Sequence, residues 1–365
     1  MTNPYSTAGV DTVAGDRAVE LMKESVAATH GPEVLGGIGG FAGLFDARAL
    51  RGMSHPLLAT STDGVGTKVA LAQALDRHDT IGQDLVGMVV DDIVVVGARP
   101  LFMTDYIACG HVVPGRIAEI VRGIALACQA TGTALVGGET AEHPGLLAPD
   151  EYDVAGAATG VVDADRVVGP ERVVAGDAVV AVASSGLHSN GFSLVRHILQ
   201  GAGVGYADYS AELGGVAGEV LLEPTRLYTA ALLQLLDDPV LGQSVHALSH
   251  VTGGGIAANL ARVLPQGSWT ELSRSGWHVP AVFSALANMA GLRLQDTEET
   301  WNLGIGFFAI VDSSAATVVV DHLNATEIPA WVAGYVQQGA PSGDGFISGA
   351  KGVHGGSVRL TGDYL

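Results

Sequence analysis

The chain has 365 residues, 48% of them hydrophobic and 51 of them glycine, which is enough for two globular domains and excludes a disordered or fibrous protein. Its formal net charge of −20 argues against a nucleic-acid partner, because binding a polyanion requires a positive surface. The longest nearly apolar run, Leu85 to Ala98, is too short to span a membrane, and the polar amino terminus is unlike a signal sequence. Two cysteines are too few for a disulfide framework, so we expect a cytoplasmic protein with no membrane partner.

Helices and strands alternate in the first half of the chain. Hydrophobic periodicity, together with the Gly and Pro residues that divide the segments, predicts each element. In chain order they are a helix over Asp11 to Thr29, a glycine-rich loop over Gly36 to Gly43, a strand over Leu57 to Ser61, a helix over Ile81 to Gly97, a strand over Leu101 to Ala108, a helix over Gly115 to Ala130, and strands over Ala134 to Val136 and Tyr152 to Val162. This alternation predicts an α/β domain.

The polar stretch from Asp163 to Asp177 predicts a domain boundary. A second α/β unit is expected beyond it, with strands over Ala178 to Ala183 and Val245 to Leu248 and helices over Phe192 to Leu199, Thr225 to Leu236 and Ile256 to Val263. The Gly- and Ser-rich end from Gln337 to Leu365 predicts a mobile tail or a lone edge strand. We therefore expect a first domain over residues 1–168, a second over 169–336, and a tail over 337–365.

Two acidic segments of the first half are candidate cation sites. In Thr62 to Lys68, Asp63 follows a strand and can hold a hard cation, the glycines allow close backbone approach, and Lys68 can meet a phosphate. In the apolar helix, Asp92 shares its face with Leu85, Met88 and Val89, so we expect it to point into the protein. Burial of that charge favours a metal shared with Asp63, and oxygen ligands favour Mg²⁺. The structural alternatives are a turn with a solvated Asp63, and a buried Asp92 that pairs with Arg or caps another helix.

Three further segments place glycines after a strand. Val136 to Glu142 predicts a glycine-rich turn in which Glu139 could complete a metal or nucleotide site. Ser184 to Gly191 and His250 to Gly255 each precede a helix, so their free amides predict anion sites, although each could be only a tight turn. His188 is suited to move a proton near neutral pH, whereas a lone loop histidine more often has a structural role.

Taken in order, segments along the chain resemble the phosphoribosylformylglycinamidine cyclo-ligases, the AIR synthetase family. The resemblance covers about residues 5 to 336, and no single motif is decisive. The matching segments are Ala8 to Asp11, Gly36 to Phe41, Thr62 to Lys68, Pro100 to Phe102 with Asp105 and Tyr106, Gly137 to Glu142 with Pro144 and Gly145, Asp153 to Gly156, Ser184 to Gly191 with Ser193 to Arg196, Pro224 to Arg226, Thr252 to Gly255, Arg262 to Pro265, and Asn302 to Gly306.

The resemblance implies ATP, Mg²⁺ and the substrate formylglycinamidine ribonucleotide. In this family ATP activates the formyl oxygen, the amidine-side nitrogen of the substrate attacks that carbon, and phosphate leaves as the imidazole ring closes. The implied fold has two α/β domains of the ATP-binding synthetase type, and the first domain pairs with its copy to close a β-barrel in a homodimer.

Carried over by position, the resemblance assigns a role to each site residue. Nucleotide contacts are expected from Lys23, Gly37, Gly39, Gly40, Phe41, Asp63, Gly64, Lys68 and Glu139, metal ligation from Asp63 and Asp92, substrate binding from Ser189, Asn190, Gly191, Thr252 and Gly253, and proton removal from His188. The chain departs from the family pattern at Asp91, Ala42 and His143, where Asn, Gly and Met are usual, and its last residues do not match the expected family end.

Five other functions remain open alternatives. Selenophosphate synthetase, thiamine-monophosphate kinase and the large formylglycinamidine synthetase have a related architecture, but the first usually carries a reactive Cys near Gly36, where this chain has none. A scaffold or maturation factor that binds nucleotide without turnover would be favoured by loss of the acids or His188, which are present. A nicotinamide dehydrogenase is disfavoured because Gly36 to Gly43 follows a helix rather than a strand.

Overall fold

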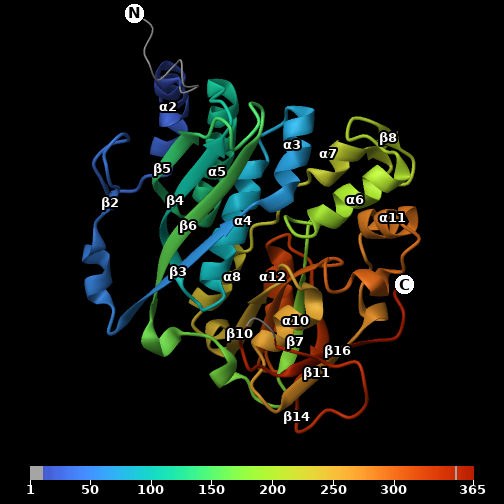
Figure 1. Cartoon of the computed structure of the whole chain (residues 1–365). Coiled ribbons are helices and arrows are strands. Elements are labelled where there is room, and N and C mark those ends of the chain that lie inside the picture. The colour runs from blue at the N-terminus through green and yellow to red at the C-terminus, as the bar shows by residue number, and fades with distance from the viewer. Residues whose placement is uncertain (1–10, 350–351) are drawn as a thin grey trace, which may run out of the picture. The chain divides into compact units, whose positions relative to one another are not determined.

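The computed structural model describes residues 11–349 and 352–365, which form two compact units (Figure 1). The first contains the residues up to Ile93 together with Ala98–Asp165, and the second contains Val94–Gly97 and Arg166–Leu365. The chain thus leaves the first unit within the polar stretch where the sequence predicts a boundary. The resembling segment Ala8 to Val10 lies outside the described residues. Within them, no helix is both long and apolar enough to cross a membrane.

The first unit is built on a four-stranded sheet in the order β3-β6-β4-β5 (Figure 1). Its strands are β3 Pro56–Gly64, β4 Arg99–Cys109, β5 Ala134–Glu142 and β6 Tyr152–Asp163, of which only β4 and β5 pair in parallel. Its helices are α2 Thr12–Ala27, α3 Val69–Leu75, α4 Ile81–Val94 and α5 Pro114–Thr131, and the short strands β1 Val34–Leu35 and β2 Leu44–Phe45 flank the glycine loop.

Helix α4 covers one face of this sheet at close range. Two glycines of β6 permit the approach, because a Cβ at Gly160 would lie 2.4 Å from Ile93 and a Cβ at Gly156 would lie 3.4 Å from Leu85. Along β6, buried residues alternate with exposed ones as far as Ala158. The sheet is therefore packed on one face and open on the other, with β3 and β5 as its edges.

The second unit has an antiparallel sheet in the order β10-β12-β7-β13. Its strands are β7 Ala178–Ala183, β10 Val245–His250, β12 Ile305–Val311 and β13 Ala330–Tyr335. All residues of β12 are buried, and the apolar core joins the sheet to α8 Thr229–Asp237 and α12 Ala316–Ala325. The other helices and the small hairpin are α6 Phe192–Ala202, α7 Ala217–Leu221, α9 Leu241–Ser244, α10 Gly255–Arg262, α11 Ala281–Met289, β8 Tyr209–Ser210 and β9 Gly215–Val216.

The expected tail is an integral part of a further sheet, so the prediction of a mobile tail or lone edge strand is wrong. The sheet has the order β14-β11-β16-β15, with β11 Ser268–Ser273, β14 Gln337–Gln338, β15 Ile347–Ser348 and β16 Ser357–Thr361. β16 pairs in parallel with β11 and buries Val358 and Leu360. Glycines of this segment serve close packing, since a Cβ at Gly355 would lie 2.1 Å from the carbonyl oxygen of Ala261. Ala350 and Lys351 lie outside the described residues.

The other predicted elements agree with the structure apart from their ends and one turn. The predicted turn over Gly137 to Glu142 is wrong, because β5 continues to Glu142. Paired in parallel with β4, these residues keep their backbone hydrogen bonds by remaining extended. Strands β11, β12 and β13 and helices α3, α11 and α12 were not predicted from the sequence.

Candidate active site

Two aspartates of the first unit lie in one row across its sheet. The register pairs Asp63 of β3 with Gly156 of β6, and Gly156 with Asp105 of β4. Residues paired in this way point to the same face, and a side chain at Gly156 would meet Leu85 of α4. Asp63 and Asp105 therefore lie on the face that α4 covers, with a glycine between them.

Asp105 is a partly buried carboxyl group that the sequence analysis did not assign to the site. Burial raises the pKa of Asp105 to about 7. Its side chain lies over Gly138 of β5, where an added Cβ would sit 1.9 Å from Asp105 Oδ1. A nearby cation would stabilise the charged form of such a carboxyl group. Asp105 is the one charged residue of the predicted strand Leu101 to Ala108, and this was the sequence signal available for it.

The prediction that Asp92 points into the protein is wrong, because Asp91 is the buried residue and Asp92 is exposed. Helix α4 is buried on nearly all sides, so apolar neighbours at helical offsets could not distinguish two adjacent acids. Asp92 lies in the last turn of α4, where the helix dipole disfavours a negative charge and a bound cation would offset it. Within residues 11–349 and 352–365, no group of three or more His, Cys, Asp or Glu side chains is arranged to hold a metal ion.

Lys68 is buried rather than presented to a ligand. Its Nζ lies 2.8 Å from both carboxylate oxygens of Asp84, and both side chains are fully buried. Two buried charges are tolerated only when they are paired, so this contact fixes the end of the Thr62 to Lys68 segment against α4. A phosphate contact was predicted for Lys68 from the sequence, and its pair with Asp84 was not anticipated.

The remaining nucleotide candidates of the first unit are exposed or half-buried. Lys23 is exposed on α2, Gly64 ends β3, and Glu139 is exposed on the edge strand β5. The glycine loop between β1 and β2 carries the fully exposed ring of Phe41, and its Gly36 and Gly39 have positive φ. Gly37 and Gly40 are exposed in the same loop.

In the second unit, residues 184–191 form a loop between β7 and α6 that is held by Asn302. The Ser184 hydroxyl donates to Asn302 Oδ1 at 3.0 Å, and Asn302 Nδ2 donates to the carbonyl oxygen of Gly186 at 2.8 Å. The Ser185 hydroxyl donates to the carbonyl oxygen of Pro224 at 2.7 Å. These contacts fix the loop before it reaches the helix.

His188 lies at the centre of this loop and is 1% exposed. Its backbone has φ of 60°, in the left-handed region, and its Nε2 accepts a hydrogen bond from the Ser185 amide at 3.2 Å. The ring centroid of Tyr228 is 6.0 Å away. The contact between Nε2 and the Ser185 amide organises the loop that contains both residues.

Tyr228 lies between His188 and His250. Its hydroxyl donates to the carbonyl oxygen of Ala183 at 2.8 Å, and its ring centroid is 6.5 Å from that of His250. His250 stacks on Phe307 at 5.4 Å. Gly306 leaves the space for this cluster, since a Cβ there would lie 1.9 Å from Tyr228 Oη and 2.7 Å from His188 Cε1.

The two glycine segments that the sequence singled out lie beside each other. Gly191 is the N-cap of α6, with φ of 78°, and Gly254 is the N-cap of α10. Asn190 Oδ1 would lie 3.4 Å from a Cβ at Gly253, so the two helix starts share a boundary. We call residues 184–191 and 252–255 the anion loops; they contain the predicted substrate residues Ser189, Asn190, Gly191, Thr252 and Gly253.

Trp301 contacts the first anion loop and was missed by the sequence analysis. A Cβ at Gly191 would lie 2.4 Å from Trp301 Cδ1 and 2.6 Å from its Nε1. The ring is 1% exposed, and its Nε1 has no hydrogen-bond partner among the residues that the structure describes. A buried indole N–H therefore lies at the start of α6 as a further donor.

Comparisons with known proteins match both units. Residues 45–162 match the family described as AIR synthase related protein, N-terminal domain, and residues 174–343 match its C-terminal domain. The chain is 46% identical over 352 residues to a phosphoribosylformylglycinamidine cyclo-ligase of Geobacillus kaustophilus, covering 96% of this chain and 100% of the relative. It is 47% identical over 337 residues to the protein of the same name from Sorangium cellulosum, covering 92% and 96%.

Solved structures with low sequence identity share the fold. A thiamine-monophosphate kinase from Stenotrophomonas maltophilia matches with a TM-score of 0.67 at 16% identity, covering 94% of this chain and 97% of that one. HypE from E. coli matches with a TM-score of 0.63 at 20% identity, covering 97% and 94%. At this level of identity the similarity extends to the two-domain α/β fold alone.

Proposed function

Because the chain belongs to the phosphoribosylformylglycinamidine cyclo-ligase family, it is a ligase of purine biosynthesis, and we propose that it closes the imidazole ring of aminoimidazole ribonucleotide with ATP. The main support for this proposal is the 46% sequence identity, which extends over the full length of a cyclo-ligase. Formylglycinamidine ribonucleotide would be phosphorylated on its formyl oxygen, its amidine-side nitrogen would attack that carbon, and phosphate would leave. The products are ADP, phosphate and aminoimidazole ribonucleotide.

We place Mg²⁺ at the acids of the first unit. Carboxylate oxygens suit this hard cation, and the raised pKa of Asp105 indicates a carboxyl group that a cation would stabilise. Asp105 thereby joins the expected ligand Asp63 in one row of the sheet. The expected ligand Asp92 lies beside Ile93, towards the other end of α4 from Leu85, and we propose it as a separate contribution to metal binding. When bound, the ion would neutralise charge on the phosphoryl group that is transferred.

The nucleotide would contact Lys23, the Gly37 to Phe41 loop, Gly64 and Glu139. Their exposure supports this proposal, since a ligand can reach them. For Lys68 the buried pair with Asp84 supports a different role, in which Lys68 anchors the segment that carries Asp63.

The anion loops of the second unit would bind the 5′-phosphate of the substrate. Backbone amides at helix N-termini attract anions, and two such termini lie side by side here. His188 would position this loop rather than remove a proton, because its Nε2 already accepts the Ser185 amide and its ring is buried. Binding would then hold the attacking nitrogen of the substrate close to the activated formyl carbon. Such positioning supplies a large part of the rate acceleration of ring closure.

We further propose a cytoplasmic homodimer. The first unit has an open sheet face and an edge strand, β3, and exposes the large apolar side chains of Leu44, Leu57, Leu58 and Tyr106. Unpaired edges and apolar patches are normally covered. A partner copy whose first domain pairs with this one to close a β-barrel, as the family resemblance implies, would cover them. Both cysteines are buried free thiols, which fits a reducing compartment.

The test is to incubate the purified protein with ATP, Mg²⁺ and formylglycinamidine ribonucleotide. We expect aminoimidazole ribonucleotide together with equimolar ADP and phosphate. Thiamine monophosphate serves as the control substrate, because a kinase for it shares the fold. Absence of the imidazole product, or phosphorylation of the control substrate instead, would refute the proposal.

A further inference from the structure

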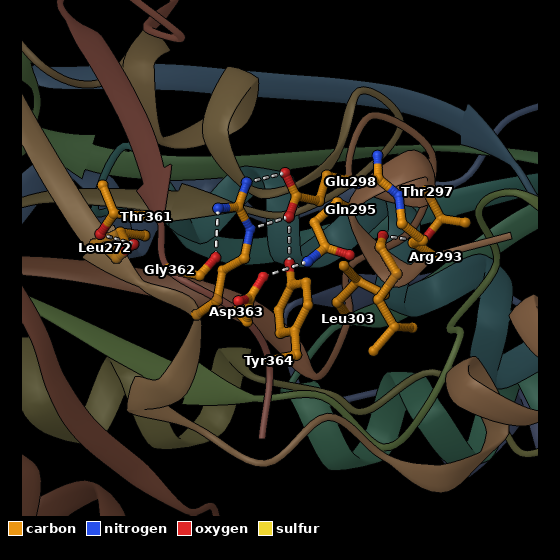
Figure 2. Close-up of polar contacts among 12 residues, drawn as sticks. Leu272, Arg293, Gln295, Thr297, Glu298, Leu303, Thr361, Gly362, Asp363 and Tyr364 are labelled. Atoms are coloured by element: carbon orange, nitrogen blue, oxygen red, sulfur yellow. Dashed lines mark hydrogen bonds and ion pairs between the residues drawn. The ribbon is translucent and has the colours of Figure 1, made fainter. Parts of the chain in front are cut away.

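Glu298 is held by two groups that come from distant parts of the second unit (Figure 2). Arg274 donates from Nε to Oε1 at 2.5 Å and from Nη2 to Oε2 at 2.9 Å, and the Tyr364 hydroxyl donates to Oε1 at 2.7 Å. The Arg274 and Glu298 side chains are 16% and 12% exposed, so solvent screens this pair only weakly. Bidentate charge-assisted contacts of this kind fix a side chain strongly.

The carboxyl-terminal segment that supplies Tyr364 is itself fixed. β16 precedes it in the sheet, and Arg274 Nη1 donates to the carbonyl oxygen of Gly362 at 3.0 Å. The Tyr364 ring meets Trp277 edge-on at 5.6 Å. Burial, together with the hydrogen bond to Glu298, raises the pKa of Tyr364, so its hydroxyl stays a donor. The end of the chain is thus a rigid support for Glu298.

Glu298 begins a short segment that contacts both anion loops. Its carbonyl oxygen would lie 1.7 Å from a Cβ at Gly255, the first residue of α10. Three residues later, Trp301 lies against Gly191 at the start of α6, and Asn302 donates to Gly186. No side chain fits between this segment and Gly255, so the backbone at Glu298 packs directly against the start of α10.

We propose that Tyr364, acting with Arg274 through Glu298, is a positioning residue that sets the affinity of the anion loops for a phosphate ester. The inference rests on the proposed function only in taking the 5′-phosphate of the substrate as the natural ligand. Trp301 adds a ligand-directed observation, since its buried Nε1–H lacks an acceptor among the described residues and lies at the N-cap of α6. The segment after residue 343 lies beyond the matched family domain, so this support is not part of that match.

The test compares Tyr364→Phe with Arg293→Ala. The first variant keeps the ring against Trp277 and removes only the hydroxyl contact to Glu298. The control removes an exposed ion pair, between Arg293 and Asp296, from the same turn of the chain and leaves the contacts of Glu298 with Arg274 and Tyr364 in place. A truncation after Gly362 is the stronger variant, and thermal unfolding defines a temperature at which all four proteins are folded.

Two quantities are measured, the dissociation constant of ribose 5-phosphate by calorimetry and the KM values for both substrates. We expect Tyr364→Phe to weaken ribose 5-phosphate binding and raise KM for the ribonucleotide about tenfold, as loss of one charged hydrogen bond allows. KM for ATP should stay within about twofold, because ATP contacts are assigned to the first unit. Arg293→Ala should match the wild type in every measurement.

The inference would be overturned if Tyr364→Phe, the truncation and the wild type had the same dissociation constant for ribose 5-phosphate and the same KM for the ribonucleotide. An equal loss in Arg293→Ala, or a wild type that does not bind ribose 5-phosphate, would also overturn it. Failure of the proposed function is distinguishable, because it would appear as a wild type that binds ribose 5-phosphate, with Tyr364-dependent affinity, yet forms no imidazole product.

Discussion

The pKa of Asp105 depends on a glycine in the neighbouring strand, because only a glycine at position 138 leaves room for the Asp105 side chain. Gly138 admits the side chain of Asp105, and burial then raises its pKa to about 7. With a pKa above the ordinary 3.8, the folded protein binds more protons than the unfolded chain between about pH 4 and pH 7. Stability from this group is therefore fully present at low pH and is lost as the pH rises through 7.

Without metal, the free energy of unfolding of the wild type should fall from pH 5 to pH 8 by a few kcal/mol relative to that of Asp105→Asn. The amide of the variant cannot ionise, so its free energy of unfolding lacks this dependence on pH. Urea unfolding of both proteins in chelator at the two pH values measures the difference. If the free energies of unfolding of the two proteins change equally with pH, the raised pKa of Asp105 is contradicted. Added Mg²⁺ should reduce the loss of wild-type stability at pH 8.

Asp63→Asn and Asp92→Asn should each raise the Mg²⁺ concentration needed for half-maximal turnover by roughly tenfold or more, because each removes a charge from a hard-cation site. Both residues are exposed, so unfolding should change little. A magnesium titration of the initial rate checks this. Glu24→Gln, on the exposed side of α2, is the charge-matched control, and a variant that behaves like it would remove the aspartate from the site.

His188→Gln should retain turnover within about tenfold of wild type, whereas His188→Ala should lose roughly 10²-fold. A glutamine carbonyl can accept the Ser185 amide as Nε2 does, and alanine cannot. The pH profile of kcat should keep its shape in the Gln variant. If both variants lose activity equally and the basic or acidic limb disappears, His188 is a proton-transfer group after all.

At the scale of elements, the sequence predicts those segments whose periodicity is undisturbed and fails where tertiary packing decides. Alternation in β6 and the amphipathic α5 were readable because one face of each is buried. The end of the chain was not readable, because glycine suggests mobility locally, while Gly355 and Gly356 are required for contact with α10 and β11. The anion loops were identified from glycines before helices, whereas Trp301 and Glu298 reach them only through the fold.

Gly306→Ala in β12 should lower the free energy of unfolding by about 2 kcal/mol or more, since its Cβ would overlap Tyr228 Oη and a packed core cannot yield. Gly201→Ala is the matched control. It lies within α6 at an exposed position where a Cβ meets nothing within 4 Å, so it should raise stability by about 0.5–1 kcal/mol. Urea unfolding gives both values, and effects of the same sign would contradict the packing argument.

The helices of the first unit leave one face of its own sheet open, and we predict that a second copy of the chain covers this face. Leu57 and Leu58 are exposed on the edge strand β3, where an isolated domain would carry polar residues, so this strand favours a partner. The sequence predicted the fold class from its α/β alternation and the homodimer from the family resemblance. It did not show which face of the sheet stays open, since an open face and a buried one have the same period of two.

Light scattering at micromolar concentration should give twice the chain mass of 37.1 kDa. Leu58→Glu should shift the protein toward the monomer, because a charge on the edge strand opposes pairing. Val174→Glu, at an exposed apolar position of the second unit, is the control and should remain dimeric. A wild type that stays monomeric would contradict the proposed assembly.

The buried pair of Lys68 and Asp84 also divides the amines of this protein by their reactivity. Lys23 is exposed, whereas Nζ of Lys68 is enclosed and contacts the carboxyl group of Asp84 at 2.8 Å. An acylating reagent needs access to the amine, and Lys68 offers none while the first unit is folded. The rate of acylation of Lys68, measured by mass spectrometry, therefore reports how often the first unit opens, and acylation of Lys23 serves as the internal standard.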